Sequence, residues 1–452
     1  MNNRTREKIY KYKRYPHIDP KIHWQEVYRA VESPDYVSAH GFYPFIHYTQ
    51  ESFKYPKAYL SGAEEKRDLP KKREIMYSCH LDRYIYEYYA HLINCMYNER
   101  VKIDGTNKCA VAYRNNLHKN NIHFAKEAFD SIRRNRNAYI LIGDFTGYFD
   151  NMSHAHLKKM LCSLLQLQCL PDDYYAVFRS ITKYSYIELS QVKTYKSMDK
   201  KQFYAVERLF SPNEFHVFKK GNVHRNKNDY GIPQGSAISA VFSNVYLLDL
   251  DKRIKDFATS QGGFYRRYCD DFIVVLPDNG VERFVLQAQK ILRLIDEIPN
   301  LTLQPQKAKA YHFSTDHVKN CSNAIFPEYQ DGSDLINYLG FSFDGSTISI
   351  RQKTIAKYYR RMYRKADTIV AHGGVSPSGK RIPRSTVYRY YSKYGKNENV
   401  NTGNLSSSKH QGNFLSYIDR AEKVFGPHES ITRDTRRAWE KLMKRLRPKP
   451  IP

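Results

Sequence analysis

Residues 265–278 read YRRYCDDFIVVLPD and carry the strongest structural signal in the chain. Two adjacent carboxylates, Asp270 and Asp271, come directly before the apolar run FIVVL at 272–276. A short apolar run between Asp and Pro is typical of a buried strand and is too short to span a membrane. Two acids beside a buried strand are costly unless metal ions or hydrogen bonds compensate their charge. We therefore predict a β-hairpin with both carboxylates at its tip.

A third carboxylate, Asp144, follows a second apolar run, and NAYILIGDF at 137–145 is rich in strand-forming residues. Taken alone, each of these acids is more simply explained as a turn residue. Magnesium prefers hard oxygen ligands, and two-metal phosphoryl transfer requires carboxylates from separate strands at one point. A strand that ends in one acid and a hairpin that carries two more can meet this requirement.

A further motif, GIPQGSAISAVFSNVYLLDLD at residues 231–251, connects these acids with nucleotide binding. A Gly-Ile-Pro-Gln-Gly turn leads directly into a helix with small residues in its first turn. Glycine permits close approach of a nucleotide to the backbone, and Gln234 can reach its sugar or its base pair. On its own, the segment also fits the ordinary first turn of a core helix.

The charge balance indicates a polyanionic partner. The 452 residues include 73 Lys and Arg against 46 acids, a formal charge of +27, and the sequence pI is about 9.5. The 39 tyrosines often stand beside basic residues, as in IYKYKRY and VYRYYSKYGK. Rings of this kind stack on bases while cations hold phosphates, so nucleic acid is the expected partner. Amphipathic helices with a solvated basic face are an equally good explanation for any single run.

The chain shows no secretory signal and no apolar stretch of membrane-spanning length, so we expect a cytoplasmic protein that does not bind membranes. None of its seven cysteines lies in a CxxC pair. This spacing argues against a zinc ribbon or a disulfide framework and predicts reduced, mostly buried thiols.

Taken together and in order, these motifs resemble those of the reverse transcriptase family. GDFTGYFDNMSHAHL is similar to the first palm motif of the family, with Asp144 as a metal ligand and Phe149 five residues later. GIPQGSAIS is similar to the second, and YCDD at 268–271 to the YxDD box. The resemblance covers about residues 65–345 and implies RNA-directed synthesis of DNA from dNTPs.

The resemblance also implies the roles of further residues. LTLQPQKAK at 301–309 places Lys307 near the triphosphate, although Gln304 stands where Asn is usual, and YLGFSF matches the primer grip. LPKKREIMYSCHLDRYIYEYY is similar to the fingers segment, although Glu74 replaces the expected proline. The full expected set comprises the metal ligands Asp144, Phe145 (through its backbone carbonyl), Asp270 and Asp271; the nucleotide-binding residues Lys71, Arg73, Phe149, Gln234, Gly235 and Lys307; and the primer grip Leu339, Gly340 and Phe341. The expected cofactor is a pair of Mg²⁺ ions, with Mn²⁺ able to substitute.

The expected fold is α+β, a right-hand polymerase with an antiparallel-sheet palm and an α-helical thumb. We expect an N-terminal extension at 1–60, fingers at 61–135 with part of 157–228, a palm within 136–345, and a basic thumb and C-terminal region at 346–452. Helices are expected at 81–100, 156–166, 238–254 and 281–298, with apolar faces in 355–369 and 414–425, and a loop or mobile arm at 371–412.

Several functions remain open at this point. Size and the YCDD and GNFLSYIDRA segments most resemble the stand-alone, defence-associated bacterial reverse transcriptases, possibly type 2, which implies antiphage activity and a dedicated non-coding RNA as template. Retron, group II intron and diversity-generating reverse transcriptases are alternatives. An RNA-dependent RNA polymerase, template-independent or protein-primed synthesis, and a catalytically retired RNA-binding scaffold complete the set.

Overall fold

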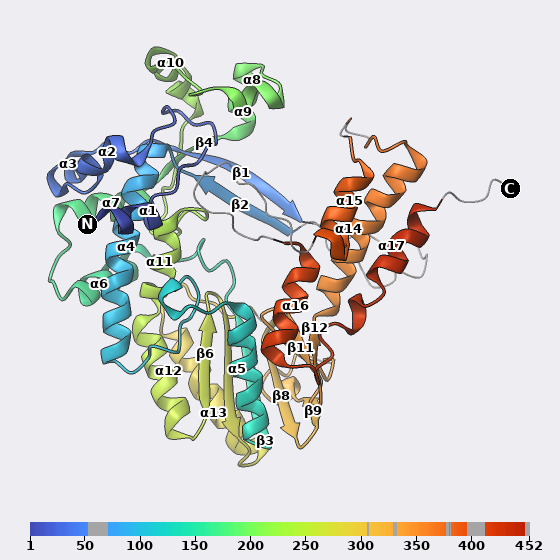
Figure 1. Cartoon of the computed structure of the whole chain (residues 1–452). Helices are drawn as coiled ribbons and strands as arrows, with labels where there is room; N and C mark the ends of the chain where they lie inside the picture. Colours follow the sequence, from blue (N-terminus) through green and yellow to red (C-terminus); the bar gives the residue numbers. More distant parts are fainter. Residues whose placement is uncertain are drawn as a thin grey trace. The chain divides into compact units, whose positions relative to one another are not determined.

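The computed structural model describes residues 1–52, 71–304, 307–328, 332–376, 379, 381–395 and 412–447. The chain forms two compact units and passes between them several times. The first unit contains Met1–Arg114, Asp144–Phe257 and Lys290–Gln304, and the second contains Asn115–Gly143, Ala258–Gln289 and Pro305–Pro452. Both units mix helices with strands, as the sequence predicts (Figure 1).

A five-stranded sheet forms the centre of the second unit. Its order is β6-β7-β3-β8-β9, and the pairs β6–β7, β3–β8 and β8–β9 are antiparallel. The strands are β3 (Asn137–Asp144), β6 (Phe264–Tyr268), β7 (Asp271–Pro277), β8 (Lys309–Ser314) and β9 (His317–Asn320). A second, antiparallel sheet consists of β10 (Ile336–Tyr338), β11 (Phe341–Phe343) and β12 (Ile348–Ile350).

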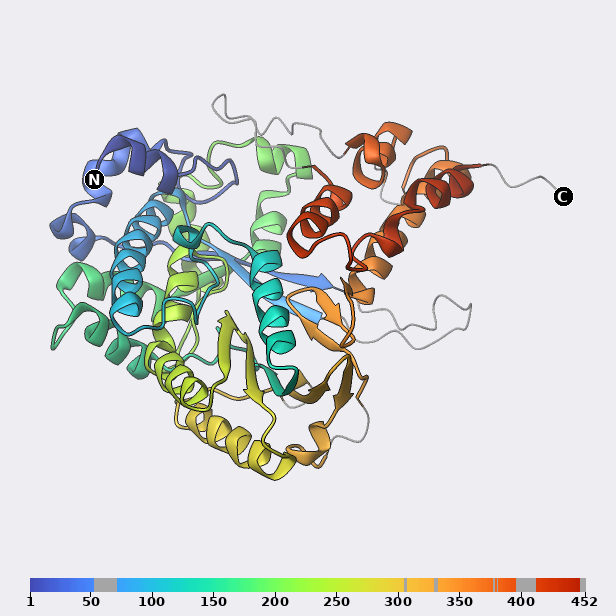
Figure 2. The ribbon, with the colours of Figure 1, turned by 60° about the horizontal axis from the view of Figure 1, so that its bottom comes forward.

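Strand β3 is buried from Ala138 to Asp144 and mostly apolar between its two ends, because both of its faces are covered. Ala138, Ile140 and Ile142 point to one face, where they join a core with the apolar side of α5 (Asn121–Arg134). On the other face, the ring of Tyr139 stacks on Phe284 of α13 (Val281–Asp296), with 4.5 Å between centroids. Figure 2 shows α5, in teal, lying over the sheet.

The C-terminal part of the second unit is helical, and Figure 1 shows α14, α15 and α17 grouped together. Its helices are α14 (Gln352–Ala371), α15 (Arg384–Tyr391), α16 (Phe414–Phe425) and α17 (Ala438–Leu446), with short 3-10 helices η5 (Lys393–Gly395) and η6 (Arg433–Thr435). The predicted apolar faces of α14 and α16 are confirmed, since Met362, Ala366, Ile418 and Ala421 are fully buried. The 3-10 helices η2 (Asn115–Leu117) and η4 (Ser322–Ala324) complete this unit.

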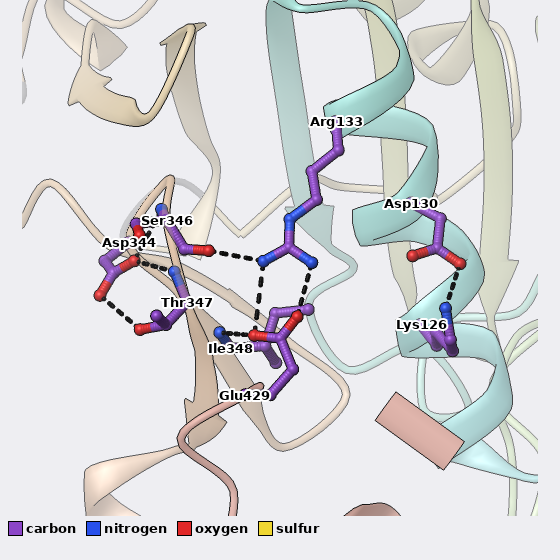
Figure 3. Close-up of polar contacts among 8 residues, drawn as sticks. All are labelled: Lys126, Asp130, Arg133, Asp344, Ser346, Thr347, Ile348 and Glu429. Carbon is purple, nitrogen blue, oxygen red and sulfur yellow. Dashed lines mark hydrogen bonds and ion pairs between the residues drawn. The ribbon is translucent and has the colours of Figure 1, made fainter. Parts of the chain in front are cut away.

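Arg133, near the end of α5, anchors the segment between α16 and α17 (Figure 3). Its guanidinium donates to Oε1 of Glu429 at 2.6 Å and to the carbonyl oxygen of Ser346 at 2.6 Å. The second carboxylate oxygen of Glu429 accepts the backbone N–H of Ile348 at 2.6 Å. One carboxylate therefore joins α5, the start of β12 and the residues that follow α16.

The first unit has a four-stranded sheet, of order β2-β1-β4-β5, surrounded by helices. Its strands are β1 (Phe45–Ser52), β2 (Lys71–Tyr77), β4 (Ser185–Glu188) and β5 (His224–Arg225). Its helices are α1 (Asn3–Ile9), α2 (Trp24–Val31), α3 (Pro34–Ala39), α4 (His80–Ile103), α6 (His154–Leu165), α7 (Asp172–Thr182), α8 (Leu189–Lys196), α9 (Lys200–Ala205), α10 (Pro212–Asn222), α11 (Ala237–Tyr246) and α12 (Leu248–Ser260). Residues 258–260 of α12 are part of the second unit, and residues 290–296 of α13 are part of the first.

The structure adds to one expectation about local structure and corrects two others. The N-terminal extension, for which only its bounds were predicted, contains α1, α2, α3 and β1, and β1 pairs with both β2 and β4. The segment 371–412 is not simply a loop, because Val387 and Tyr391 bury one side of α15 within the described residues. The predicted helix at 238–254 is two helices, α11 and α12, that meet at Leu247.

The cysteines are free thiols, as expected, but only Cys79, Cys109 and Cys269 are buried. None of the helices in the described ranges is both long and apolar enough to cross a bilayer.

Candidate active site

The three predicted carboxylates meet at one end of the five-stranded sheet. Asp144 is the last residue of β3, and β7, the neighbouring strand in the sheet, begins with Asp271. Oxygens of Asp144, Asp270 and Asp271 all lie within 4.8 Å of one another. Asp144 is 7% exposed, and the other two carboxylates are half-buried.

This arrangement favours a cation. Two ionised carboxylates at such a distance repel each other by about 3 kcal/mol at an effective dielectric constant near 20. A divalent ion between the oxygens reverses the sign of this interaction. The donors are hard oxygens, which suit Mg²⁺ or Mn²⁺ better than soft metals. The three residues thus fit the predicted metal pair by the chemistry of their donors.

Buried side chains of the second unit fix the β6–β7 hairpin turn that carries Asp270. Tyr268 pairs with Asp271, and Cys269, between them, has a left-handed backbone with φ of 60°. Arg267, which is completely buried, donates to the carbonyl oxygen of Cys269 at 2.8 Å. Its neighbour Arg266 forms an ion pair with Glu127 of α5. Sequence reasoning missed both arginines, although two successive cations in a buried strand signal that at least one faces the interior.

In the first unit, backbone hydrogen bonds attach the Gly-Ile-Pro-Gln-Gly turn to two other segments. The backbone N–H of Ile232 donates to the carbonyl oxygen of Phe149 at 2.9 Å, and Met76 of β2 donates to the carbonyl oxygen of Gln234 at 2.8 Å. Gly235 has a φ of +125°, and a Cβ there would lie 2.3 Å from the carbonyl oxygen of Met76. The predicted nucleotide residues Phe149, Gln234 and Gly235 are therefore brought together beside β2.

The amide of Gln234 contacts Asp150, an acid that the sequence reasoning did not single out, at 3.3 Å. His154, the first residue of α6, contacts the carbonyl oxygen of Gly231 through Nε2 at 2.8 Å. Burial lowers the pKa of His154, so its ring is neutral near pH 7 and donates to this carbonyl. The turn is thus connected by hydrogen bonds to Phe149 itself and to residues that follow it.

Arg73 lies on β2 and is exposed, opposite Gln50 of β1. The next residue, Glu74, points to the other face, because side chains alternate along a strand. There it accepts from the hydroxyl of Thr49 at 2.7 Å and contacts Nε2 of His47 at 2.7 Å. These cross-strand contacts give Glu74, which stands in place of the expected proline, a structural role. The backbone of Lys71 begins β2, but its side chain lies outside the described residues.

The remaining predicted residues lie in different places. Phe145 forms a backbone bridge with Leu303, in the first unit, and Lys307 is exposed in the second. Leu339 and Gly340 form the two-residue turn between β10 and β11, both with positive φ (47° and 94°), and Asn121 donates to the carbonyl oxygen of Leu339 at 3.1 Å. Phe341 is fully buried against Phe425, with 4.7 Å between ring centroids. It belongs to the core, so the turn itself is the accessible part of the predicted primer grip.

No protein-family model and no curated protein matches the chain. Solved structures that align with it include an apo telomerase from Candida tropicalis truncated from its C-terminal domain, with 12% identity over 63% of this chain and 54% of that chain and a TM-score of 0.40. Another is telomerase from Candida albicans in complex with a TWJ fragment of telomeric RNA, with 14% identity over 94% and 67% of the two chains and a TM-score of 0.38. The chain thus spans about half the length of the first of these structures. At such TM-scores the likeness does not establish a shared fold, so the functional argument rests on the motifs and the geometry of this chain.

Proposed function

We propose that the protein is an RNA-directed DNA polymerase, a reverse transcriptase that extends a 3′-OH with dNTPs. The observation that carries this proposal is the convergence of Asp144, Asp270 and Asp271, with oxygens within 4.8 Å. The same acids belong to motifs that occur in the order typical of reverse transcriptases. Because folding brings the three acids together, they can bind metal ions, which supports a metal-dependent reaction. The order of the motifs along the chain supports nucleotide addition.

Each residue has a proposed part in this reaction. Asp144 and Asp270 would hold the two magnesium ions, with Asp271 and the backbone carbonyl of Phe145 as further support. Bound there, the ions would supply activation of the attacking 3′-oxygen and charge stabilisation for the triphosphate and the leaving pyrophosphate. Lys71 and Arg73 neutralise the incoming triphosphate, and Lys307 acts near the pyrophosphate.

The substrate pocket is proposed around the Gly-Ile-Pro-Gln-Gly turn. Gly235 lets the nucleotide approach the backbone, and Gln234 orients its sugar or base pair. The ring of Phe149 excludes a ribose 2′-OH, which selects dNTPs over rNTPs. The turn at Leu339 and Gly340 positions the primer end. Basic residues of α14 and of the N-terminal segment hold the template RNA through its phosphates, without reading its sequence.

We also propose the finer assignment, a stand-alone polymerase of bacterial antiphage defence that acts in the cytoplasm and copies a dedicated non-coding RNA. It rests on the resemblance of the YCDD and GNFLSYIDRA segments and on the basic charge of the chain. In this proposal, residues 61–135 with part of 157–228 act as fingers, 136–345 contain the palm, and 346–452 form the thumb and C-terminal region.

The test is dNTP incorporation by the full chain, purified with its bound RNA and supplied with Mg²⁺, followed by sequencing of the product. We expect DNA complementary to a single co-purified RNA, and no product from the Asp270→Ala, Asp271→Ala double variant. Asp316→Asn, an exposed acid between β8 and β9, is the matched control and should retain activity. Product from the double variant, or ribonucleotide polymers from the wild type, would refute the proposal. A retron-type or intron-type RNA among the templates would replace only the finer assignment.

A further inference from the structure

A second convergence of metal-ligand side chains lies in the first unit, far along the sequence from the catalytic acids. His17 and Asp19 precede α2, and Cys79 lies between β2 and α4. One ligand atom from each of the three residues lies within 4.8 Å of the others. His17 and Cys79 have no exposed surface, and Asp19 is 7% exposed.

The imidazole of His17 directs a lone pair into this cluster. Its Nε2 lies 3.2 Å from the carbonyl oxygen of Tyr77, which can only accept a hydrogen bond, so Nε2 carries the proton. Nδ1 is then an acceptor, and it has no hydrogen-bond partner among the described residues. Its neighbour at 3.9 Å, Oδ1 of Asp19, is an acceptor too.

Asp19 has a structural role that does not account for His17. Its two oxygens accept the backbone N–H groups of His80 and Leu81, each at 2.9 Å, and so cap the first turn of α4. Each carboxylate oxygen has a second lone pair that these bonds leave available. The helix cap explains why an acid stands at position 19. The thiol of Cys79 hydrogen-bonds to the same carboxylate, but neither contact satisfies the buried Nδ1 of His17.

We propose that Nδ1 of His17, a carboxylate oxygen of Asp19 and the sulfur of Cys79 bind one zinc ion. Imidazole, carboxylate and thiolate are the three ligand types that zinc takes from proteins, and a thiolate disfavours magnesium. At zinc bond lengths of about 2.0–2.3 Å, tetrahedral ligands stand about 3.5 Å apart, so atoms that now lie within 4.8 Å need to close by at most about 1.3 Å. The thiol of Cys79 releases its proton to solvent when the metal binds. A water molecule can supply the fourth ligand.

The ion would connect segments that are distant in the sequence. It ties residues 17–19 to the junction of β2 and α4, which lies next to the strand that carries Arg73. The burial of all three ligands favours a structural ion, and its binding energy adds to the stability of the folded unit. The inference does not depend on the proposed polymerase function, because none of these residues belongs to the predicted active site.

The first test is the metal content of the full-length protein, purified without metal-chelating resin and measured by mass spectrometry. We expect one zinc per chain in the wild type and in Asp144→Asn. His17→Ala and Cys79→Ala should lose it, whereas Cys109→Ala, which removes another buried thiol of the same unit, should keep it. Zinc retained in both Cys79→Ala and His17→Ala would overturn the assignment.

The second test needs no variant to fold. Wild-type protein in which Co²⁺ replaces zinc should show the intense absorption of a thiolate-to-cobalt bond and of tetrahedral cobalt. A chelator that removes the metal should lower the thermal unfolding midpoint of the wild type. Folded wild-type protein that contains no zinc, and whose cobalt spectrum lacks the thiolate band, would overturn the proposal whether or not the chain polymerises nucleotides.

Discussion

At the scale of single residues, Phe149 offers the sharpest test of substrate choice. It is half-buried beside the Gly-Ile-Pro-Gln-Gly turn, and its carbonyl oxygen accepts the N–H of Ile232. We expect Phe149→Ala to remove the steric barrier to a 2′-OH. A barrier of about 1.4 kcal/mol corresponds to a tenfold preference, so the ratio of kcat/KM for dNTP over rNTP should fall by about tenfold or more. Single-nucleotide incorporation measures this ratio.

The matched control for Phe149 is Tyr204→Ala, which removes an exposed ring in the same unit. It should leave the ratio unchanged. Unaltered selectivity in Phe149→Ala would mean that another group excludes the ribose hydroxyl.

Arg267 should act on the reaction without touching the substrate. Its buried guanidinium holds the carbonyl oxygen of Cys269 in the turn before Asp270. Arg267→Met removes this donor, and the loss of a hydrogen bond from a charged group costs about 1.5–3 kcal/mol. We expect a lower kcat and a higher Mg²⁺ concentration for half-maximal activity, both measured by magnesium titration. Arg267→Lys should recover part of the metal affinity. A variant with lower stability but the wild-type magnesium curve would contradict this positioning role.

The convergence of Asp144, Asp270 and Asp271 could be predicted from sequence because each stands in a motif whose order along the chain carries information. The supports of these motifs could not be predicted in this way. The contact of Gln234 with Asp150 joins residues 84 positions apart, and Asn121 reaches Leu339 over 218 positions. Such pairings depend on the tertiary fold and leave no local pattern. The cluster of His17, Asp19 and Cys79 could not be predicted for the same reason, because its residues are distant in the sequence.

At the scale of secondary-structure elements, the attachment of α5 can be measured. Glu429 is 9% exposed at its side chain and accepts from both Arg133 and the N–H of Ile348. Glu429→Ala leaves a guanidinium and a backbone donor without their acceptor, so we expect a loss of about 2–3 kcal/mol in the free energy of unfolding. Urea denaturation measures the change.

Figure 3 also contains the control for Glu429. Asp130 and Lys126 form an ion pair one turn apart on α5, and both side chains are more than one third exposed. Surface pairs with this spacing contribute about 0.3–0.5 kcal/mol, so Asp130→Ala should change stability little. Equal losses of unfolding free energy in the two variants would show that Glu429 stabilises the fold no more than a surface ion pair does.

The elements that sequence patterns predicted best are long or strongly apolar. Helix α4, helix α13 and the strands β3 and β7 lie within a few residues of their expected places. The short elements α1, α2, α3 and α15 were missed. A helix of six to eight residues has too few turns to show a period, and its stability comes from the surface that it covers.

At the scale of the whole molecule, the formal charge of +27 predicts a strong dependence of RNA binding on salt. Lys357, Arg361 and Arg364 are exposed on α14. Replacing all three by Glu should weaken binding and reduce the slope of log K against log salt by about 2–3, because each lost phosphate contact removes about 0.7–0.9. Filter binding at several salt concentrations gives the slope.

Lys252→Glu and Lys255→Glu together, on α12, serve as the control for the change of charge alone. They should lower affinity slightly and leave the slope nearly intact. If the α14 variant keeps the wild-type slope, then the RNA path lies over another surface.

The mixture of helices and strands was predictable, and the fingers, palm and thumb boundaries stay a prediction. The division into two compact units has no signal in the sequence, because α4 and α5 follow one another along the chain but belong to different units. The chain changes unit after residues 114, 143, 257, 289 and 304. Crossings of this kind follow from strand pairing across long separations, and composition or charge does not mark them.

The strand order of the five-stranded sheet also has a consequence for synthesis on the ribosome. Strand β3 lies between β7 and β8, which are translated more than one hundred residues later. Since ribosomes add about 5–20 residues per second, the apolar segment YILIG waits on the order of ten seconds before either neighbour exists. During that interval its unpaired edges can join those of other nascent chains. Slower translation between residues 145 and 270 would prolong this exposure, so the yield of folded protein should depend on codon choice in that interval and on chaperones that shield nascent chains.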